Sequence, residues 1–319
     1  FNDAVTSPAF DRSPSNGIRL AEYPDTTNLA AASAPIVPEF RDYAMERPVT
    51  DDVFDAYRQA YAYDATPLNA RVVSSDTAAG WIRERVEMDA AYGGERLTVF
   101  LFLPREGTGP RQTVVYFPGS DDLYKRSYDQ LDPPDLIVRS GRVLVYPVYK
   151  GTYDRGGSIS SDVQDASNNY RDHVIAWSKD LGRALDYAVT RPEVDPEKLG
   201  YFGISWGSAM APIVTALEPR IRASVLIVGG LAMQKTQPMV DPFNFLPRVK
   251  APTLLVNARY DSFFPVESSQ RPFFAHLGLD ESEKRLVITE SNHFVLSYAA
   301  NQAIKETLDW YDRFLGPVR

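Results

Sequence analysis

Residues 199–207 have the sequence Leu199-Gly200-Tyr201-Phe202-Gly203-Ile204-Ser205-Trp206-Gly207, in which an apolar run suited to a buried strand leads into the pattern Gly-x-Ser-x-Gly. A helical stretch from Trp206 to Leu217 follows directly. The two glycines permit a turn too tight for larger side chains, so Ser205 would lie on a strained elbow with its hydroxyl exposed. A chance match in a strand-to-helix turn is the alternative, but the flanking elements favour a nucleophilic serine.

Short apolar runs and helical stretches alternate along the chain from Trp81 onward. Continuously apolar runs are typical of strands covered by helices on both faces, and their alternation with helices favours a mostly parallel sheet. The sequence therefore predicts an α/β fold with a mostly parallel eight-stranded sheet, helices on both faces and chemistry at the carboxyl ends of the strands. The candidate strands are Ile82 to Met88, Leu97 to Leu103, Thr113 to Phe117, Val143 to Val148, Leu199 to Ile204, Ala223 to Val228, Thr253 to Ala258 and Arg285 to Thr289. The candidate helices are Asp172 to Thr190, Trp206 to Leu217, Val266 to Leu277 and Ala299 to Leu315.

The first part of the chain has a different composition. Residues 1–48 are rich in Pro, Ala, Ser and Asn and show no sustained helical or strand period. We interpret 1–48 as an N-terminal extension or linker, or the end of a preceding domain, and 49–319 as a catalytic domain. A helix is expected from Thr50, whose side chain could cap it, through Tyr61.

Composition narrows the classes of partner and cofactor. The 42 acidic and 34 basic residues give a net charge of −8, which disfavours binding to nucleic acid or anionic lipid. No apolar run reaches the roughly 18 residues of a membrane span, and the segment after Phe1 lacks the features of a signal peptide, which favours a cytoplasmic protein. With no cysteine and three histidines, neither a metal nor another cofactor is expected. Homo-oligomer formation is left open.

A serine nucleophile requires a neighbouring base, and the three histidines differ in their positions. His173 lies inside a predicted helix, and His276 lies at the end of another, where a structural role suffices. His293 follows the last predicted strand and precedes the final helix, a position from which a loop histidine can reach the elbow. His293 is therefore the candidate base, and a solvent-exposed loop histidine is the alternative.

The carboxylate that orients the base should follow a strand between Ser205 and His293 in the sequence. Asp261 leaves the predicted strand Thr253 to Ala258 and is the leading candidate. The alternative is an aspartate that caps a helix beginning near Pro265. Glu290, three positions before the histidine, is a rival carboxylate.

The developing oxyanion of an acyl-transfer reaction needs hydrogen-bond donors. The backbone N–H of Trp206, directly after the nucleophile, is one candidate. The N–H of Ser120 is the other, because Pro118 sets a turn after a strand and Gly119 allows close approach of the backbone to a substrate. A merely structural Pro-Gly turn is the alternative.

Only Leu231 to Lys250 is available at the usual cap position, and about twenty residues cannot form a large helical lid at a rise of about 1.5 Å per residue. A small cap and an accessible cleft are expected. Met233 and Phe243 could line an acyl pocket, although packing of the short loop on itself explains them equally well. Tyr124 and Tyr153 lie in loops at the catalytic end and could contact an aromatic or sugar alcohol group.

Four segments together carry a family resemblance: Phe117-Pro118-Gly119-Ser120, Pro147 to Tyr153, Gly203 to Gly207 and Asn257 to Pro265. Over roughly residues 55 to 315, the chain resembles α/β-hydrolase domains related to prolyl oligopeptidase and dienelactone hydrolase. It is similar to bacterial esterase-like domains attached to protein kinases or formylglycine-generating-enzyme-like domains, and Phe10 to Leu20 resembles the closing strand region of the latter. The order Ser, Asp, His is that of α/β-hydrolases.

The resemblance implies a serine carboxylesterase that acts on a small-molecule ester, short-chain or aryl, through an acyl-enzyme. Two features depart from the related families: Glu290-Ser291-Asn292-His293 replaces the usual Gly-His pair, and dienelactone hydrolases use a cysteine, which this chain lacks. A peptidase or arylamidase is less favoured, because no segment of β-propeller size precedes the catalytic region. A sensor module without activity is the third alternative.

Overall fold

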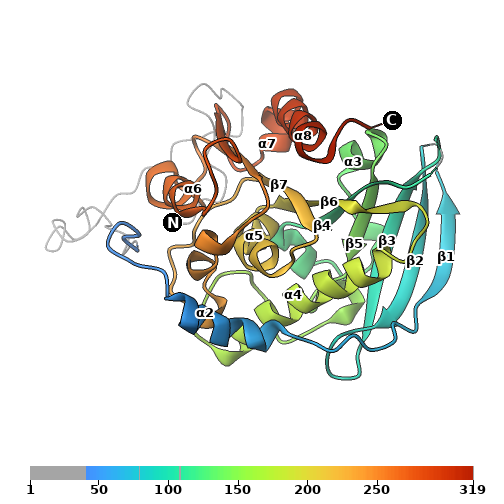
Figure 1. Cartoon of the computed structure of the whole chain (residues 1–319), viewed down its shortest axis with the longest axis horizontal. Coiled ribbons are helices and arrows are strands. Elements are labelled where there is room, and N and C mark those ends of the chain that lie inside the picture. Colours follow the sequence, from blue (N-terminus) through green and yellow to red (C-terminus); the bar gives the residue numbers. More distant parts are fainter. Residues whose placement is uncertain (1–40, 79, 108, 319) are drawn as a thin grey trace, which may run out of the picture.

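A computed structural model describes residues 41–78, 80–107 and 109–318 of the chain. Phe10 to Leu20, and most of the predicted N-terminal extension, lie outside the described residues. A single nine-stranded sheet forms the centre of the fold, with helices on both of its faces (Figure 1). This arrangement confirms the predicted α/β-hydrolase fold class.

The strands of the sheet lie in the order β1-β2-β3-β5-β4-β6-β7-β8-β9. The pairs β1–β2, β2–β3 and β3–β5 are antiparallel, and the remaining five pairs are parallel. The strands are β1 (Arg71–Thr77), β2 (Trp81–Asp89), β3 (Arg96–Pro104), β4 (Arg111–Phe117), β5 (Val143–Pro147), β6 (Val194–Ile204), β7 (Ile221–Ile227), β8 (Thr253–Ala258) and β9 (Lys284–Thr289).

The prediction of eight strands was one short, because β1 carries no apolar pattern. Six of its seven residues are exposed, and among the described strands it pairs only with β2, at the edge of the sheet. A polar edge strand is stabilised by its backbone pairing and has no buried face to reveal it in the sequence.

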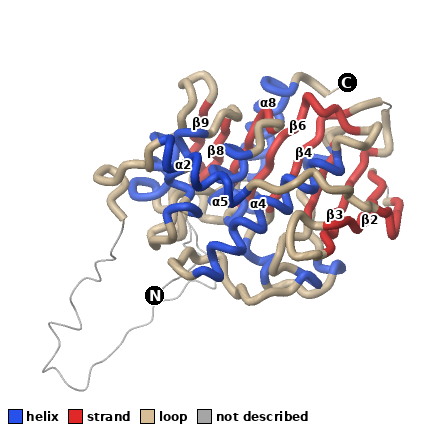
Figure 2. The backbone as a smooth tube through the Cα atoms, turned by 60° about the horizontal axis from the view of Figure 1, so that its bottom comes forward, coloured by secondary structure: helices blue, strands red, loops and turns tan. Residues whose placement is uncertain are grey.

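Successive residues of the buried strands face opposite sides, so the sheet supports two cores. Val115 packs in the core on the side of α4 (Asn168–Ala188) and α5 (Trp206–Leu217), whereas Val114 packs on the side of α8 (Ala300–Leu315). Figure 2 shows α4 and α5 lying across the sheet. The remaining helices of the described residues are α2 (Asp51–Arg58), α3 (Asp135–Arg139), α6 (Arg271–His276) and α7 (Val295–Tyr298). No described helix is long and apolar enough to cross a membrane.

The predicted helical segment after Thr50 is present through Tyr61, but its last turn is a 3₁₀ turn and its cap differs from the prediction. It comprises α2 and a 3₁₀ turn, Gln59–Tyr61. Thr50 is the N-cap residue, but its side chain makes no capping hydrogen bond. The helix is held instead by Phe54, which is buried against the ring of Phe245.

The segment between β7 and β8 is the small cap that the sequence predicts. It contains three 3₁₀ turns, Pro238–Val240, Pro242–Asn244 and Leu246–Arg248. A proline lies at the start of each turn, so these turns cannot extend backward as α-helix. The cap is therefore a compact layer over the core and not a helical lid.

Candidate active site

Ser205 lies between the end of β6 and the start of α5 in a strained backbone conformation, with φ 51° and ψ −105°. A positive φ is unfavourable for a side chain other than glycine, so the surrounding structure must hold it. Backbone hydrogen bonds do so on both sides: Ser205 N–H donates to Ile227 O at 2.9 Å, and Gly207 N–H donates to Pro118 O at 2.9 Å.

Both glycines of the Gly-x-Ser-x-Gly pattern lie where a side chain would collide with backbone. A Cβ on Gly207 would lie 2.1 Å from Phe117 O, and one on Gly203 would lie 2.8 Å from the Gly207 carbonyl group. The close approach of β4, β6 and α5 therefore requires glycine at both positions. This supports the interpretation of the pattern as a tight elbow.

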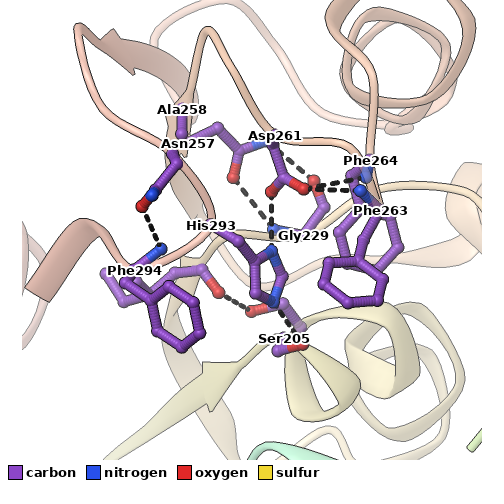
Figure 3. Close-up of polar contacts among 12 residues, drawn as sticks. Ser205, Gly229, Asn257, Ala258, Asp261, Phe263, Phe264, His293 and Phe294 are labelled. Carbon is purple, nitrogen blue, oxygen red and sulfur yellow. Dashed lines mark hydrogen bonds and ion pairs between the residues drawn. The ribbon is translucent and has the colours of Figure 1, made fainter. Parts of the chain in front are cut away.

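The structure brings Ser205, His293 and Asp261 together in one chain of hydrogen bonds (Figure 3). His293 Nε2 lies 2.8 Å from Ser205 Oγ, and His293 Nδ1 lies 2.8 Å from Asp261 Oδ2. The Asp261 side chain is fully buried, and one tenth of the His293 side chain is exposed. This geometry can remove the serine proton and stabilise the resulting imidazolium.

Asp261 uses its two oxygens for different purposes. Oδ2 faces His293, and Oδ1 accepts hydrogen bonds from the backbone N–H groups of Phe263 and Phe264 at 2.9 and 3.0 Å. Asp261 does not cap the helical turn Val266–Gln270, whose N-cap is Pro265 with no capping side chain; Oδ1 instead closes the turn that precedes it. The turn holds the carboxylate in the orientation that the histidine needs.

The rival carboxylate Glu290 lies outside the hydrogen-bond chain. Its side chain is exposed and binds Arg259 Nε at 2.6 Å and the Tyr260 hydroxyl at 3.2 Å. Hydrogen bonds from Arg259 N–H and Tyr260 N–H to the carbonyls of Thr289 and Ser291 run alongside these contacts. Glu290 therefore ties the loop of Asp261 to the loop of His293.

The other two histidines bond to their own helices. His173 Nδ1 lies 2.8 Å from the carbonyl of Asn169 in α4, and His276 Nδ1 lies 2.8 Å from the carbonyl of Pro272 in α6. Neither interacts with Ser205, in agreement with the structural roles expected for them.

The two candidate oxyanion donors both belong to backbone close to the nucleophile. Trp206 is the first residue of α5, and the first N–H groups of a helix have no partner within it. Ser120 begins a 3₁₀ turn after Gly119, and a Cβ on Gly119 would lie 3.8 Å from Ser205 Cβ. The Gly119-Ser120 turn therefore lies against the nucleophile.

The four candidate substrate contacts divide into two groups. Tyr124 is 61% exposed, and Met233 is half-buried. Phe243 and Tyr153 are each only 2% exposed: Phe243 packs on Tyr43 and His276, and the Tyr153 hydroxyl lies 3.2 Å from that of Tyr146. The structure does not support direct substrate contact by Phe243 or Tyr153, because both side chains fill the core.

Two aromatic rings that the sequence analysis did not select flank the histidine. Phe263 is 48% exposed, with its ring centre 4.7 Å from that of His293, and Phe294 is 45% exposed at 6.1 Å. Phe263 lies two positions after Asp261, and Phe294 directly follows His293. This proximity in the sequence is the feature from which their position beside the site could have been predicted. They form an apolar rim beside the base (Figure 3).

Asp162 is a further missed residue, in the irregular segment between η4 (Tyr153–Arg155) and α4. Burial raises the pKa of Asp162. Hydrogen bonds from its own N–H and from the Ser120 side chain, and the charge interaction with His293, act in the opposite direction. No sequence motif surrounds Asp162, so only the fold shows that it lies near the site. Within the described part of the chain, no group of three His, Asp or Glu residues could hold a metal ion.

Comparison with known proteins identifies a family and several similar proteins. Residues 158–317, just over half of the chain, match the family model described as PET hydrolase-like. A bis(hydroxyethyl) terephthalate hydrolase of Streptomyces coelicolor is 26% identical over 156 residues, which cover 47% of this chain and 46% of that protein. Cutinase 2 of Thermobifida cellulosilytica is 23% identical over 216 residues, covering 63% of this chain and 72% of that protein.

Among solved structures, an acetyl xylan esterase from Paenibacillus sp. R4 is similar, with a TM-score of 0.63 and 16% identity. That comparison covers 85% of this chain and 98% of the esterase, and at this identity it concerns the fold alone. The chain spans about half the length of the Streptomyces relative. Because the family model matches just over half of the chain, residues 158–317, the chain belongs to the PET hydrolase-like family.

Proposed function

We propose that this protein is a serine carboxylesterase that hydrolyses esters through an acyl-enzyme. Ser205 is the nucleophile, His293 the general base and Asp261 the carboxylate that orients the histidine. The observation that carries the proposal is the hydrogen-bond chain from the strained elbow through His293 to Asp261, with distances of 2.8 Å at both steps.

In the first half of the reaction, Ser205 Oγ attacks the ester carbonyl carbon while His293 Nε2 takes the hydroxyl proton. The Nδ1–H bond to Asp261 keeps Nε2 free for this transfer. The carbonyl oxygen becomes an oxyanion, which the N–H groups of Trp206 and Ser120 stabilise. Collapse of this intermediate breaks the ester C–O bond, and the leaving alcohol takes the proton from His293.

Water repeats these steps on the acyl-enzyme. His293 removes a proton from the water, the resulting hydroxide attacks the acyl carbon, and collapse returns the proton to Ser205 and releases the carboxylic acid. Each proton transfer thus uses the same nitrogen, and no further reactant is required.

The proposed substrates are esters of short-chain or aromatic acids. The exposed rings of Phe263 and Phe294 beside His293 offer an apolar surface for an aryl group. The Streptomyces relative, which is 26% identical to this chain over 156 residues, is named for bis(hydroxyethyl) terephthalate, an ester of an aromatic acid. These facts support esters of aromatic acids as one substrate class.

The proposal predicts that Ser205→Ala removes nearly all esterase activity and leaves the thermal midpoint almost unchanged. A triad nucleophile typically accounts for on the order of 10⁶ in kcat, whereas its side chain contributes little to packing. The test is hydrolysis of p-nitrophenyl acetate together with labelling by a fluorophosphonate probe. Retention of more than a few per cent of the activity, or undiminished labelling, would show that Ser205 is not the nucleophile.

A paired measurement separates an esterase from a peptidase. The p-nitrophenyl ester and the p-nitroanilide of the same acyl group present the same acid with different leaving groups. We expect hydrolysis of the ester to dominate, and faster cleavage of the anilide would assign the chain to the arylamidases.

A further inference from the structure

Asp122 is a buried carboxylate in the turn that carries the candidate oxyanion donor Ser120. This turn is the 3₁₀ helix η2 (Ser120–Leu123), in which Asp122 N–H donates to Gly119 O at 3.3 Å. The hydrogen-bonded ring that this contact closes contains the Ser120 nitrogen. Asp122 is only 2% exposed, so its side chain points into the protein. The position of Asp122 is thus coupled to that of the Ser120 N–H.

Two donors hold the Asp122 carboxylate, one on each oxygen. Lys125 Nζ donates to Oδ1 at 2.8 Å, and the Tyr146 hydroxyl donates to Oδ2. A carboxylate removed from water is stable only where such partners replace its hydration. Lys125 lies three positions along the same segment, whereas Tyr146 is the last residue but one of β5. The bond to Tyr146 therefore ties the turn to the central sheet.

Tyr146 is itself fixed in the core. Its buried ring packs edge-on against the ring of Tyr116 in β4, with the ring centres 4.9 Å apart. Its hydroxyl lies 3.2 Å from that of the buried Tyr153. Because β4 and β5 are parallel neighbours and η2 follows β4, Tyr146 lies at the same end of the sheet as the turn. The partner of Asp122 can thus serve as a fixed point for the turn.

The two candidate oxyanion donors differ in how firmly their own elements hold them. Trp206 begins α5, a helix of 12 residues, and hydrogen bonds to Ile227 O and Pro118 O fix the elbow around it. Ser120 begins a helix of four residues, whose N-cap Gly119 has no side chain to cap it. Such a short 3₁₀ helix has few internal hydrogen bonds. The Ser120 N–H therefore depends on contacts outside the turn for its position.

We propose that Asp122 is a positioning residue, which fixes the Ser120 N–H for the oxyanion by tying η2 to the Tyr146 hydroxyl. This inference rests on the proposed function. Asp122 acts through the turn and is not assigned a contact with the substrate. Its ion pair with Lys125 offsets a negative charge that would otherwise oppose the oxyanion.

Two substitutions of Asp122 remove the same charge but differ in hydrogen bonding. We expect Asp122→Ala to lower kcat on p-nitrophenyl acetate by about 30-fold, with KM within about twofold, because oxyanion contacts form in the transition state. Asp122→Asn can still accept a hydrogen bond and should lose about threefold to tenfold. If only the charge mattered, both variants would be equal, and kcat would rise because a negative charge near the oxyanion is removed.

The tie to the sheet is tested by Tyr146→Phe, which keeps the ring and removes the hydroxyl. This variant should lower kcat by about tenfold. Combined with Asp122→Ala, it should cause no greater loss than Asp122→Ala alone, because the two residues form one contact. Asp121→Asn is the matched control, since it removes an exposed carboxylate from the same turn. We expect it to change kcat less than about twofold.

A transition-state analogue distinguishes a misplaced donor from a less stable protein. Phenyl trifluoromethyl ketone adds to a serine hydroxyl and forms a tetrahedral adduct, whose oxyanion needs the same donors as the reaction intermediate. Its inhibition constant should rise in Asp122→Ala by the same factor by which kcat/KM falls, about 30-fold. The assays are run well below the melting temperature of each variant. Lower stability alone would leave the inhibition constant unchanged under these conditions.

Additive losses in the double variant, equal or higher kcat in both Asp122 variants, or an unchanged inhibition constant would each overturn the proposal. If Asp122→Ala does not fold, Tyr146→Phe and Asp122→Asn, alone and combined, decide by the same criteria. Wild type and Ser205→Ala are assayed alongside. An inactive wild type overturns the proposed function and this inference together, whereas an active wild type matched by the Asp122 variants overturns this inference only.

Discussion

At the scale of single residues, which of Asp261 and Glu290 can bind His293 depends on the direction in which each carboxylate points and not on its distance from the histidine along the chain. Glu290 is three positions from His293, yet its carboxylate points outward to Arg259 and Tyr260. Asp261 is 32 positions away, and its Oδ2 faces Nδ1 at 2.8 Å. The parallel pairing of β8 with β9 brings the two loops side by side, so a distant residue becomes the partner.

We predict that Asp261→Asn lowers kcat by on the order of 10² to 10⁴, because the amide keeps the shape but cannot stabilise the imidazolium. Glu290→Gln should lower kcat less than about tenfold, since it weakens only an exposed tie between loops. The measurement is kcat on p-nitrophenyl acetate for both purified variants. The reverse ranking would assign the acid to Glu290.

Residues that follow strands or precede helices could be placed from the sequence. Ser205, Asp261 and His293 were selected in this way, and the structure joins all three. The burial of Phe243 and Tyr153 could not be predicted from neighbouring strands and helices. It depends on partners such as Tyr43 and Tyr146, which the fold brings to them.

At the scale of elements, the pattern of apolar residues in the sequence predicts only those strands and helices that have a buried face. All eight strands predicted from apolar runs exist, whereas the exposed edge strand β1 was missed. The helix predicted from Val266 to Leu277 is divided into a π turn, Val266–Gln270, and α6, with Pro272 near the junction. Proline has no backbone N–H to donate, so the hydrogen-bond pattern changes near Pro272. The spacing of apolar residues that predicted one continuous helix does not reveal this change.

The cap leads to a prediction on acyl-chain length. The side chains of Phe243, Phe245 and Leu246 in the cap are buried in the core, so they are not available to cover a long acyl chain. We expect higher kcat/KM on p-nitrophenyl acetate and butyrate than on the dodecanoate, and the ratio across this series is the measurement. Higher kcat/KM on the dodecanoate would mean that another surface binds the chain.

At the scale of the whole molecule, the segment before α2 is part of the folded unit. Tyr43 is buried against the ring of Phe243, and its hydroxyl donates to the carbonyl of Ala232. Arg41 binds Asp241 at 2.8 Å, and both side chains are largely buried. The predicted boundary near residue 48 separates regions of different composition, but a few residues before it pack on the cap. The sequence of these residues does not show to which of the two regions they belong. Their contacts in the structure assign them to the catalytic domain.

Arg41 and Asp241 therefore form a buried pair across the predicted domain boundary. Burial raises the pKa of Asp241, and the hydrogen bond and charge of Arg41 oppose this shift. Arg41 also binds Glu46, so it is the loss of Arg41 that leaves a charge, that of Asp241, uncompensated. Loss of one partner of a buried pair typically destabilises a protein by about 3–5 kcal/mol. Residues 41–49 should accordingly contribute to stability even though they carry no candidate catalytic group.

The prediction compares a chain that begins at Arg41 with one that begins at Thr50, so that only residues 41–49 differ. The shorter chain should keep its kcat but melt at least about 5 °C lower, because it loses the contacts of Tyr43 and leaves Asp241 unpaired. Asp241→Asn provides the control. It should destabilise the longer chain, where it breaks the pair with Arg41, and stabilise the shorter one, where it removes the unpaired charge. Equal melting temperatures for the two chains, or the same effect of Asp241→Asn in both, would show that residues 41–49 do not hold the cap.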